Sequence, residues 1–173
     1  MRRVVTMELC FRGAGSRAVV AGAWWHLDGA RVILSLMKWK LLTIGKPALE
    51  YARLGADEYV RRLQRQTDFS WQVVKVLPAE KPVGHFWLVL DERGAALTTM
   101  ALREKVDGWE MAAVKHITVM IGGSDGHDQS TRARADLVLG LSALTLQHEL
   151  ALVVFLEALY RVYTLKRGEP YHR

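Results

Sequence analysis

The sequence predicts an α/β fold in which helices pack on both faces of a mainly parallel β-sheet. Its 173 residues are within the usual size of a single domain. Half of the residues are apolar and 24% are charged, which is typical of an ordinary globular protein. From residue 37 onwards, β-rich runs alternate with segments of helical periodicity. Alternation of this kind is typical of helices that cover both faces of a parallel sheet.

The individual elements follow from periodicity and from start and stop signals. Small and apolar residues at i, i+3 and i+4 spacing between Ala52 and Leu63 predict the first helix. Thr98 or Thr99 offers a hydroxyl N-cap for a helix over residues 99–106. Gly168 follows the end of a long predicted helix, as glycine commonly does. The other predicted helices are residues 130–135 and 149–165, and the predicted strands are residues 38–44, 71–77, 86–90, 117–121 and 137–141.

The connection between the second and third predicted strands is short. It consists of residues 78–85, whereas a crossover between neighbouring parallel strands needs a dozen or more residues and usually contains a helix. The sequence therefore predicts that these two strands pair antiparallel or that one of them leaves the sheet.

Residues 1–36 are interpreted as an N-terminal extension of doubtful status, and residues 37–173 as the domain. The first segment has no sustained periodicity. Its arginines are typical of a targeting peptide, but Arg12 and Arg17 interrupt any apolar region long enough to serve as one. The favoured interpretation is that translation starts at Met37 and that the preceding residues are upstream sequence read in frame.

The formal charge of +6 is compatible with a phosphate-bearing partner without establishing one. Five arginines against two acidic residues give residues 1–36 a net charge of +3, so the rest of the chain also carries +3. A body this mildly basic would gain little affinity from naked RNA, because nonspecific affinity grows with the number of phosphates neutralised.

Composition excludes several classes of protein. The uncharged stretches, such as residues 137–148, are shorter than the roughly 18 apolar residues that a membrane span needs. Cys10 is the only cysteine, so neither an intramolecular disulfide nor a cysteine-based zinc site can form. The histidines have no metal-ligand spacing, and there is neither a Gly-x-Ser-x-Gly elbow nor a Walker lysine. We therefore expect a cytoplasmic protein without a metal.

Glycines follow the strand predicted over residues 117–121, at Gly122, Gly123 and Gly126. Glycine permits positive φ and close approach of a ligand, and open α/β sheets bind ligands at the carboxyl ends of their strands. The same spacing is equally compatible with a tight turn before a helix. It is not the GxGxxG pattern of dinucleotide-binding proteins.

Five short signatures occur in a fixed order in the last third of the chain. They are Ile-Gly-Gly-Ser-Asp-Gly (121–126), Leu-Ser-Ala-Leu-Thr (141–145), His148, Glu-Ala-Leu-Tyr-Arg (157–161) and Gly-Glu-Pro-Tyr-His-Arg (168–173). In this order the set resembles the RlmH family, which are SPOUT-superfamily methyltransferases that modify N3 of a pseudouridine in 23S ribosomal RNA. The likeness extends from Met37 to Arg173. It implies a SPOUT-type single domain with a C-terminal trefoil knot.

The resemblance also implies the cofactor, S-adenosylmethionine, and its pocket. In the family, the segment after the last strand folds into the knot and holds the adenine with main-chain groups. Such an arrangement is chemically reasonable, because apolar side chains enclose the ligand while a few polar groups orient it. The implied cofactor-binding residues are Leu90, Gly122, Leu141, Ser142, Ala143, Leu144, Thr145 and Leu146.

Glu157 and Arg161 lie at i, i+4 spacing in the last helix. Taken alone, this spacing is that of an ordinary helix-surface ion pair. The resemblance makes Arg161 a candidate for holding a phosphate or the target base, with Glu157 fixing it. Terminal residues usually fray, so the functional side chains beyond this helix need a reason. Tyr171 is suited to stacking on an unpaired base, and Lys166 and Arg167 complete the predicted substrate-binding set.

Methylation of N3 requires that the nitrogen lose its proton and that the methyl donor and the base be held in line. His172 is the predicted base or base-orienter, and Arg161 and Arg173 are predicted to stabilise the developing anion. These three residues form the predicted catalytic set. No step of this reaction needs a metal.

The last helix is apolar around much of its surface, which predicts a partner. The resemblance implies that it packs against its twin in a homodimer that acts on the assembled ribosome. Two departures are visible: relatives generally have a longer connection in place of residues 78–85, and they often have an arginine at the position of Leu152. An alternative function is therefore a non-catalytic RNA-binding or ribosome-assembly protein derived from the family. A different small-ligand α/β enzyme is a second alternative.

Overall fold

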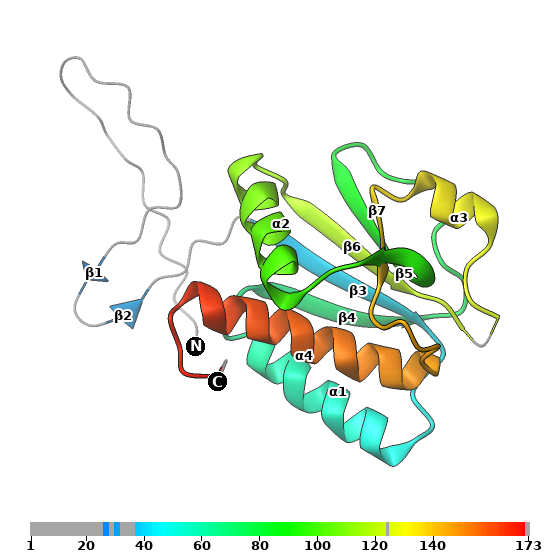
Figure 1. Cartoon of the computed structure of the whole chain (residues 1–173), viewed down its shortest axis with the longest axis horizontal. Coiled ribbons are helices and arrows are strands. Elements are labelled where there is room, and N and C mark those ends of the chain that lie inside the picture. Colours follow the sequence, from blue (N-terminus) through cyan, green and yellow to red (C-terminus); the bar gives the residue numbers. More distant parts are fainter. Residues whose placement is uncertain (1–25, 28–29, 32–36, 124, 172–173) are drawn as a thin grey trace, which may run out of the picture.

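The computed structural model describes residues 26–27, 30–31, 37–123 and 125–171 (Figure 1). His172, Arg173 and most of residues 1–36 lie outside the described residues. Ahead of the domain, β1 (His26–Leu27) and β2 (Ala30–Arg31) form a short antiparallel pair.

From residue 37 the chain alternates strands and helices, as its periodicity predicted. The elements are β3 (Lys38–Ile44), α1 (Glu50–Leu63), β4 (Asp68–Val74), β5 (His85–Ala96), α2 (Thr99–Met111), β6 (His116–Ile121), α3 (Gln129–Arg134), β7 (Leu137–Gly140) and α4 (His148–Lys166). The hydroxyl of Thr98 accepts a 3.2 Å hydrogen bond from the amide of Ala101, so Thr98 is the N-cap of α2. None of the described helices is long and apolar enough to cross a membrane.

Five strands form one sheet in the order β4-β3-β6-β5-β7, and every neighbouring pair is parallel. The predicted mainly parallel sheet is thus confirmed. Because all five strands share a direction, their carboxyl ends meet at one edge. In open α/β sheets this edge is where ligands bind.

The expectation that the second and third predicted strands pair antiparallel, or that one leaves the sheet, is wrong. β4 and β5 both belong to the sheet and run parallel, but β3 and β6 lie between them. Residues 75–84 make the crossing without a helix. Extended chain advances ~3.3 Å per residue, which suffices to pass two strands spaced about 4.8 Å apart. The minimum of about a dozen residues holds for a crossover between neighbouring parallel strands, and β4 and β5 are not neighbours.

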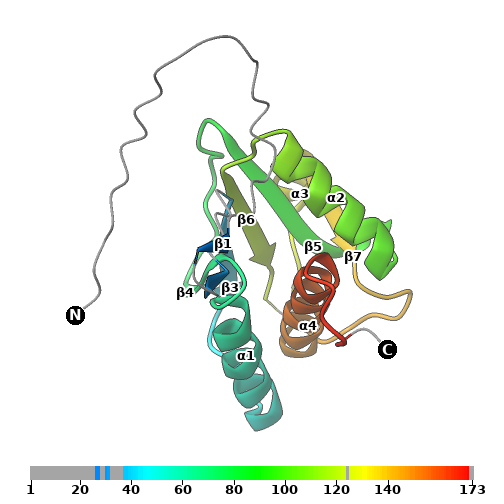
Figure 2. The same cartoon turned by 90° about the vertical axis from the view of Figure 1, so that its left-hand side faces the viewer.

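The principal core lies on one face of the sheet, beneath α1, α2 and α4 (Figures 1 and 2). Alternate strand residues such as Leu41, Val119 and Leu88 point into it, as the period of two in a strand requires. Helix α4 crosses this face between α1 and α2. Seven uncharged residues of α4 are buried there: Leu152, Phe155, Leu156, Leu159, Val162, Tyr163 and Thr164. Much of its apolar surface is therefore covered within one chain.

The opposite face carries a second and smaller apolar cluster. It consists of Leu42, Trp87, Val89 and Met120, with Leu77 and Ala135 packed against it. Leu77 belongs to the link between β4 and β5, and Ala135 follows α3. Helices therefore cover the two faces of the sheet unequally, because the connection between β4 and β5 contains no helix.

Candidate active site

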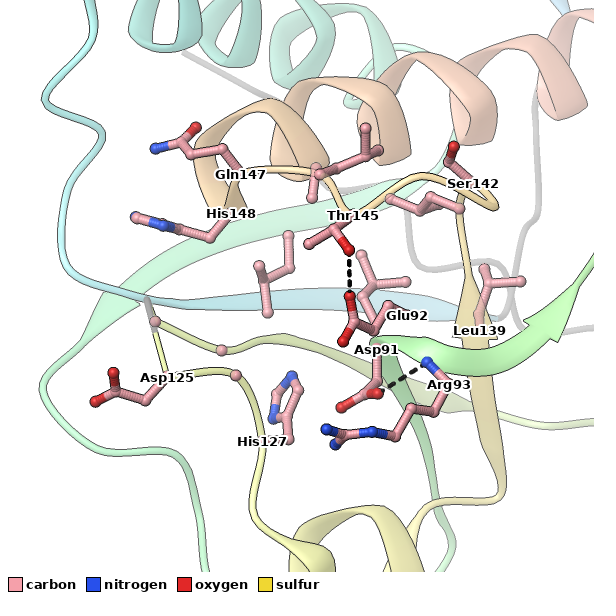
Figure 3. Close-up of a pocket in the computed structure, with 18 of the residues that line it drawn as sticks. Asp91, Glu92, Arg93, Asp125, His127, Leu139, Ser142, Thr145, Gln147 and His148 are labelled. Carbon is pink, nitrogen blue, oxygen red and sulfur yellow. Dashed lines mark hydrogen bonds between the residues drawn. The ribbon is translucent and has the colours of Figure 1, made fainter.

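A cavity of ≈ 730 Å³ opens at the carboxyl edge of the sheet, between the ends of β5, β6 and β7 and the start of α4 (Figure 3). This volume is within the range of pockets that bind small organic ligands. Seven of the eight residues expected to bind a cofactor line it: Leu90, Gly122, Leu141, Ser142, Leu144, Thr145 and Leu146. Ala143 is not among the lining residues. Residues far apart in the sequence thus converge on one cavity, and their binding of a cofactor stays a prediction.

The side of the cavity formed by β5 is a β-bulge. Leu90 and Ala95 both pair with Leu139, so residues 91–94 leave the ladder between them. Bulges often re-aim side chains beside functional sites. Here Asp91, Glu92 and Arg93 line the cavity, and none of them was among the predicted site residues. Their only sequence signal was a polar run directly after a buried strand.

The bulge contacts the loop after β7 directly. The hydroxyl of Thr145 donates a 2.7 Å hydrogen bond to Glu92 Oε2 (Figure 3). Gly94 lies so close to the strand beside it that a Cβ at this position would be 2.6 Å from the backbone nitrogen of Gly140. Bulge and loop therefore fix each other's position across the cavity.

The glycines after β6 form a tight loop at the rim. A Cβ on Gly122 would meet the carbonyl oxygen of Gly126 at 2.6 Å, and Gly126 has a φ of +69°. Gly123 and Gly126 form a bridge, with a 3.1 Å hydrogen bond from the amide of Gly126 to the carbonyl of Gly123. The glycines therefore form a tight turn that is also a wall of the cavity, and their role in binding a ligand stays a prediction.

His127, directly after these glycines, has a side chain that projects toward the cavity (Figure 3). The residue is 7% exposed, and neither ring nitrogen makes a hydrogen bond of normal geometry with the described residues. Burial lowers the pKa of His127, although the nearby Asp91 carboxylate acts in the opposite direction. The imidazole is therefore neutral at pH 7. Asp91 in turn pairs with Arg132 at 3.4 Å.

Helix α4 begins at the cavity. Gln147 is its N-cap and accepts a 3.1 Å hydrogen bond from the amide of Leu150. His148 lines the cavity, and the next residue, Glu149, reaches the start of α1 by accepting hydrogen bonds from the amides of Ala48 (3.0 Å) and Leu49 (2.8 Å). These contacts tie the beginnings of α1 and α4 together beside the cavity.

A second group of functional side chains gathers farther along α4. Arg161 Nε donates a 3.0 Å hydrogen bond to Glu157 Oε1, so the predicted pairing of these two residues is confirmed. The Arg161 guanidinium lies 4.9 Å from the centre of the Tyr171 ring. Hydrogen bonding to Glu157 raises the pKa of Arg161, which stays cationic. Arg161 and Tyr171 are thus neighbours within one chain.

The two other basic residues expected to bind substrate make ion pairs within the chain. Lys166 Nζ lies 2.8 Å from Asp107 and 2.5 Å from Glu110 of α2. Arg167 donates a 3.2 Å hydrogen bond to the carbonyl of Gln66 and lies 3.8 Å from Glu169. These contacts anchor the end of α4 to its neighbours.

The cavity and the Arg161 cluster do not meet within one chain. Helices rise 1.5 Å per residue, so the stretch of α4 from His148 to Arg161 spans about 20 Å. His172 and Arg173 lie outside the described residues. Across those that are described, no group of three or more His, Cys, Asp or Glu side chains is arranged to hold a metal ion.

Comparison with known proteins assigns the fold and the family. The model of the predicted SPOUT methyltransferases matches residues 37–172. The proteins named ribosomal RNA large subunit methyltransferase H from Thermus thermophilus and Deinococcus deserti are 46% and 41% identical to this chain. Each alignment covers 79% of this chain. It covers 99% of the Thermus protein and 100% of the Deinococcus protein. A solved structure, a probable methylase family protein from Haemophilus influenzae, matches with a TM-score of 0.51 at 11% identity. That match covers 80% of this chain and 71% of the other, and it supports the fold alone.

Relatives differ in length. The alignment with the Thermus protein has 141 positions, whereas that with the Burkholderia vietnamiensis methyltransferase H (33% identical) has 156, although both cover the same 79% of this chain. The Burkholderia relative therefore has residues without a counterpart here, and the Thermus relative has nearly the same length as this domain. The chain accordingly belongs to the SPOUT methyltransferases and, within them, to the family of ribosomal RNA large subunit methyltransferase H.

Proposed function

We propose that this protein transfers a methyl group from S-adenosylmethionine to N3 of a pseudouridine in 23S ribosomal RNA of the assembled large subunit. The observation that carries the proposal is the cavity at the carboxyl edge of the sheet, lined by the family's glycine loop and by the loop after β7. Relatives at 46% and 41% identity bear the name of this methyltransferase. The mildly basic body fits a folded particle better than naked RNA, because shape and additional contacts can supply affinity that charge does not.

The residues of the cavity fit the proposed cofactor. Leu90, Leu141 and Leu146 offer apolar contacts, and the glycine loop exposes main-chain groups that no side chain covers. Asp91 and Glu92 place two carboxylates at the wall; Asp91 is paired with Arg132, and Glu92 accepts the hydrogen bond from Thr145. When bound, S-adenosylmethionine supplies an electrophilic methyl group on a positively charged sulfur. We further propose that residues 141–147 form the trefoil knot of the family, held in place by the hydrogen bond between Thr145 and Glu92.

We propose that the complete active site is shared between two copies of the chain. Arg161 is about 20 Å along α4 from the cavity of its own protomer, and Tyr171 packs against Arg161. Both are too far away to act on a base held in that cavity. A second copy could bring its own C-terminal cluster to this cavity. Four leucines are exposed and suited to such a contact: Leu49 directly before α1, Leu54 within α1, Leu144 in the loop after β7 and Leu150 in the first turn of α4. Of these, Leu144 lines the cavity.

In this shared site the protein removes a proton from N3 and stabilises the resulting charge. His172 is the proposed base or base-orienter, and Arg173 and Arg161 offer cationic stabilisation to the anion. Glu157 holds the Arg161 guanidinium in place. Lys166 and Arg167 support the substrate surface indirectly, through the ion pairs that anchor the end of α4.

The function is tested by measuring S-adenosylmethionine affinity and methyl incorporation into ribosomes separately. Ribosomes from cells that lack this protein should lack one N3-methylpseudouridine, and the purified protein should restore it. Cofactor binding without transfer would favour the non-catalytic RNA-binding alternative. Absence of both binding and transfer would refute the proposal.

The shared site is tested by mixing two inactive variants. Gly122→Ala displaces the loop that forms the cavity wall of one chain, and Arg161→Ala removes the cation of the other. A heterodimer has one intact composite site out of two. Equal mixing makes half of the dimers heterodimers, so it should restore roughly one quarter of wild-type activity if subunits exchange freely. If each protomer were self-sufficient, or if the protein were monomeric, mixing would restore nothing.

A further inference from the structure

The chain after α4 is folded back by a defined turn. Gly168 has a φ of +67°, its amide donates a 3.1 Å hydrogen bond to the carbonyl of Leu165, and the amide of Glu169 donates one of 2.9 Å to Thr164. Glycine in this conformation commonly ends helices, because it satisfies the last carbonyls without strain. The turn directs Tyr171 back toward the middle of α4.

The Tyr171 hydroxyl makes two hydrogen bonds with different elements. It donates to Glu157 Oε1 of α4 at 3.2 Å and lies 3.1 Å from the hydroxyl of Tyr59 on α1. A phenol has a single proton to donate, so the proton between the two tyrosines must come from Tyr59. The result is a chain in which Tyr59 donates to Tyr171, and Tyr171 donates to a carboxylate. Bonds that end on a charged acceptor are stronger than neutral ones.

Tyr171 is also enclosed on its ring. The Tyr160 ring meets it edge to face, with centroids 4.9 Å apart and an interplanar angle of 76°, and the Arg161 guanidinium lies 4.9 Å from its centre. Burial raises the pKa of Tyr171, so its hydroxyl remains a donor across the range in which the protein functions. The ring and the hydroxyl of Tyr171 are thus both engaged by the chain itself.

We propose that Tyr59 and Tyr171 are positioning residues that clamp the C-terminal tail against α1 and α4, a role that rests on the proposed methyltransferase function. His172 follows Tyr171 directly, and consecutive Cα atoms are about 3.8 Å apart. Anchoring Tyr171 therefore restricts how far the chain can carry the proposed base, the next residue, away from that anchor. In this arrangement Tyr171 serves as the anchor of the tail, and a target base would not need to stack on its ring.

The two roles of Tyr171 are separated by Tyr→Phe substitutions, which remove the hydroxyl and keep the ring. A clamp requires that Tyr59→Phe and Tyr171→Phe each lower kcat by roughly tenfold, which is the loss expected for one hydrogen bond to a charged network. The double variant should be no worse than Tyr171→Phe, because that substitution alone already removes both hydrogen bonds of the chain. S-adenosylmethionine affinity and the KM for ribosomes should not change. Tyr51→Phe, an exposed tyrosine of the same helix, is the matched control and should behave as wild type.

A second measurement does not depend on catalysis. Carboxypeptidase should remove residues beyond Tyr171 faster from Tyr59→Phe than from wild type or Tyr51→Phe, because the tail is released. Wild-type kcat together with wild-type digestion of Tyr59→Phe would overturn the clamp. Full activity of Tyr171→Phe would likewise overturn the clamp, because the hydroxyl would then contribute nothing. If wild-type protein transfers no methyl group to ribosomes, the proposed function fails, while the digestion still decides whether the clamp exists.

Discussion

The indole Nε1 of Trp39 in β3 donates a 2.8 Å hydrogen bond to the hydroxyl of Tyr163 in α4. Trp39 is 1% exposed and Tyr163 is 4% exposed, so water cannot replace either partner. This bond joins the central part of the sheet to the helix that links the cavity to the C-terminal cluster. It fixes the position of α4 against the sheet in a way that apolar packing alone would not.

Tyr163→Phe should therefore destabilise the protein, because it leaves the buried indole N–H of Trp39 without its acceptor. The expected decrease in the free energy of unfolding is ~1–3 kcal/mol, the usual effect of an unsatisfied buried donor. Urea denaturation measures it. The exposed Tyr51→Phe should shift the midpoint far less, and equal shifts for both variants would show that the buried bond contributes nothing specific.

Glu149 should make stability depend on pH in the acid range. Hydrogen bonds from the amides of Ala48 and Leu49 lower the pKa of Glu149 below 4.5. Stabilisation is then complete above pH 4.5 and is lost as pH falls through the lowered pKa, because only the ionised carboxylate accepts both bonds fully. Glu149→Gln should lower the melting temperature at about pH 7 and approach wild type in strong acid. A difference that stays constant from neutral pH into strong acid would contradict this account.

Two adjacent glycines should respond differently to alanine. A Cβ at position 122 meets the backbone of Gly126 at 2.6 Å, whereas one at position 123 finds only the Ile44 side chain, at 3.7 Å. Gly122→Ala must displace the loop that forms the cavity wall, so S-adenosylmethionine affinity should fall at least tenfold. Gly123→Ala should bind nearly as wild type by calorimetry. Equal affinities for both variants would place the cofactor away from this loop.

His127 should make the folded state less stable as pH falls below neutral. Burial lowers the pKa of His127 below 6.5 in the folded protein. Below pH 6.5 the imidazole therefore becomes protonated in the unfolded chain before it does so in the folded chain. Stability is complete above pH 6.5 and decreases as pH falls toward the folded-state pKa. His127→Leu removes this titration, and its melting temperature should decline less than that of wild type between about pH 7.5 and about pH 5.5. Parallel declines in scanning calorimetry would exclude a buried neutral imidazole.

Local sequence signals located most of the secondary structure and part of the site. The helix spacing from Ala52 to Leu63, the N-cap Thr98 and the glycines after residue 121 each depend on neighbouring residues only, and each appears where it was predicted. The family resemblance contributed the convergence of Leu90, Gly122 and residues 141–146 on one cavity, with Ala143 as the exception. Spacing alone could not have brought these segments together.

Other features depend on contacts between residues distant in the sequence. The placement of β4 and β5 with two strands between them, the bulge at Asp91, and the contact between Tyr59 and Tyr171 have no local signature. The periodicity of apolar residues indicates which side of a helix or strand is buried, because the pattern is set by residues close together in the sequence. It does not indicate which other element packs against that side. The sequence by itself therefore determined the elements, the glycine turn and the family, whereas only tertiary packing decided that the cavity and the C-terminal cluster lie at separate places on one chain.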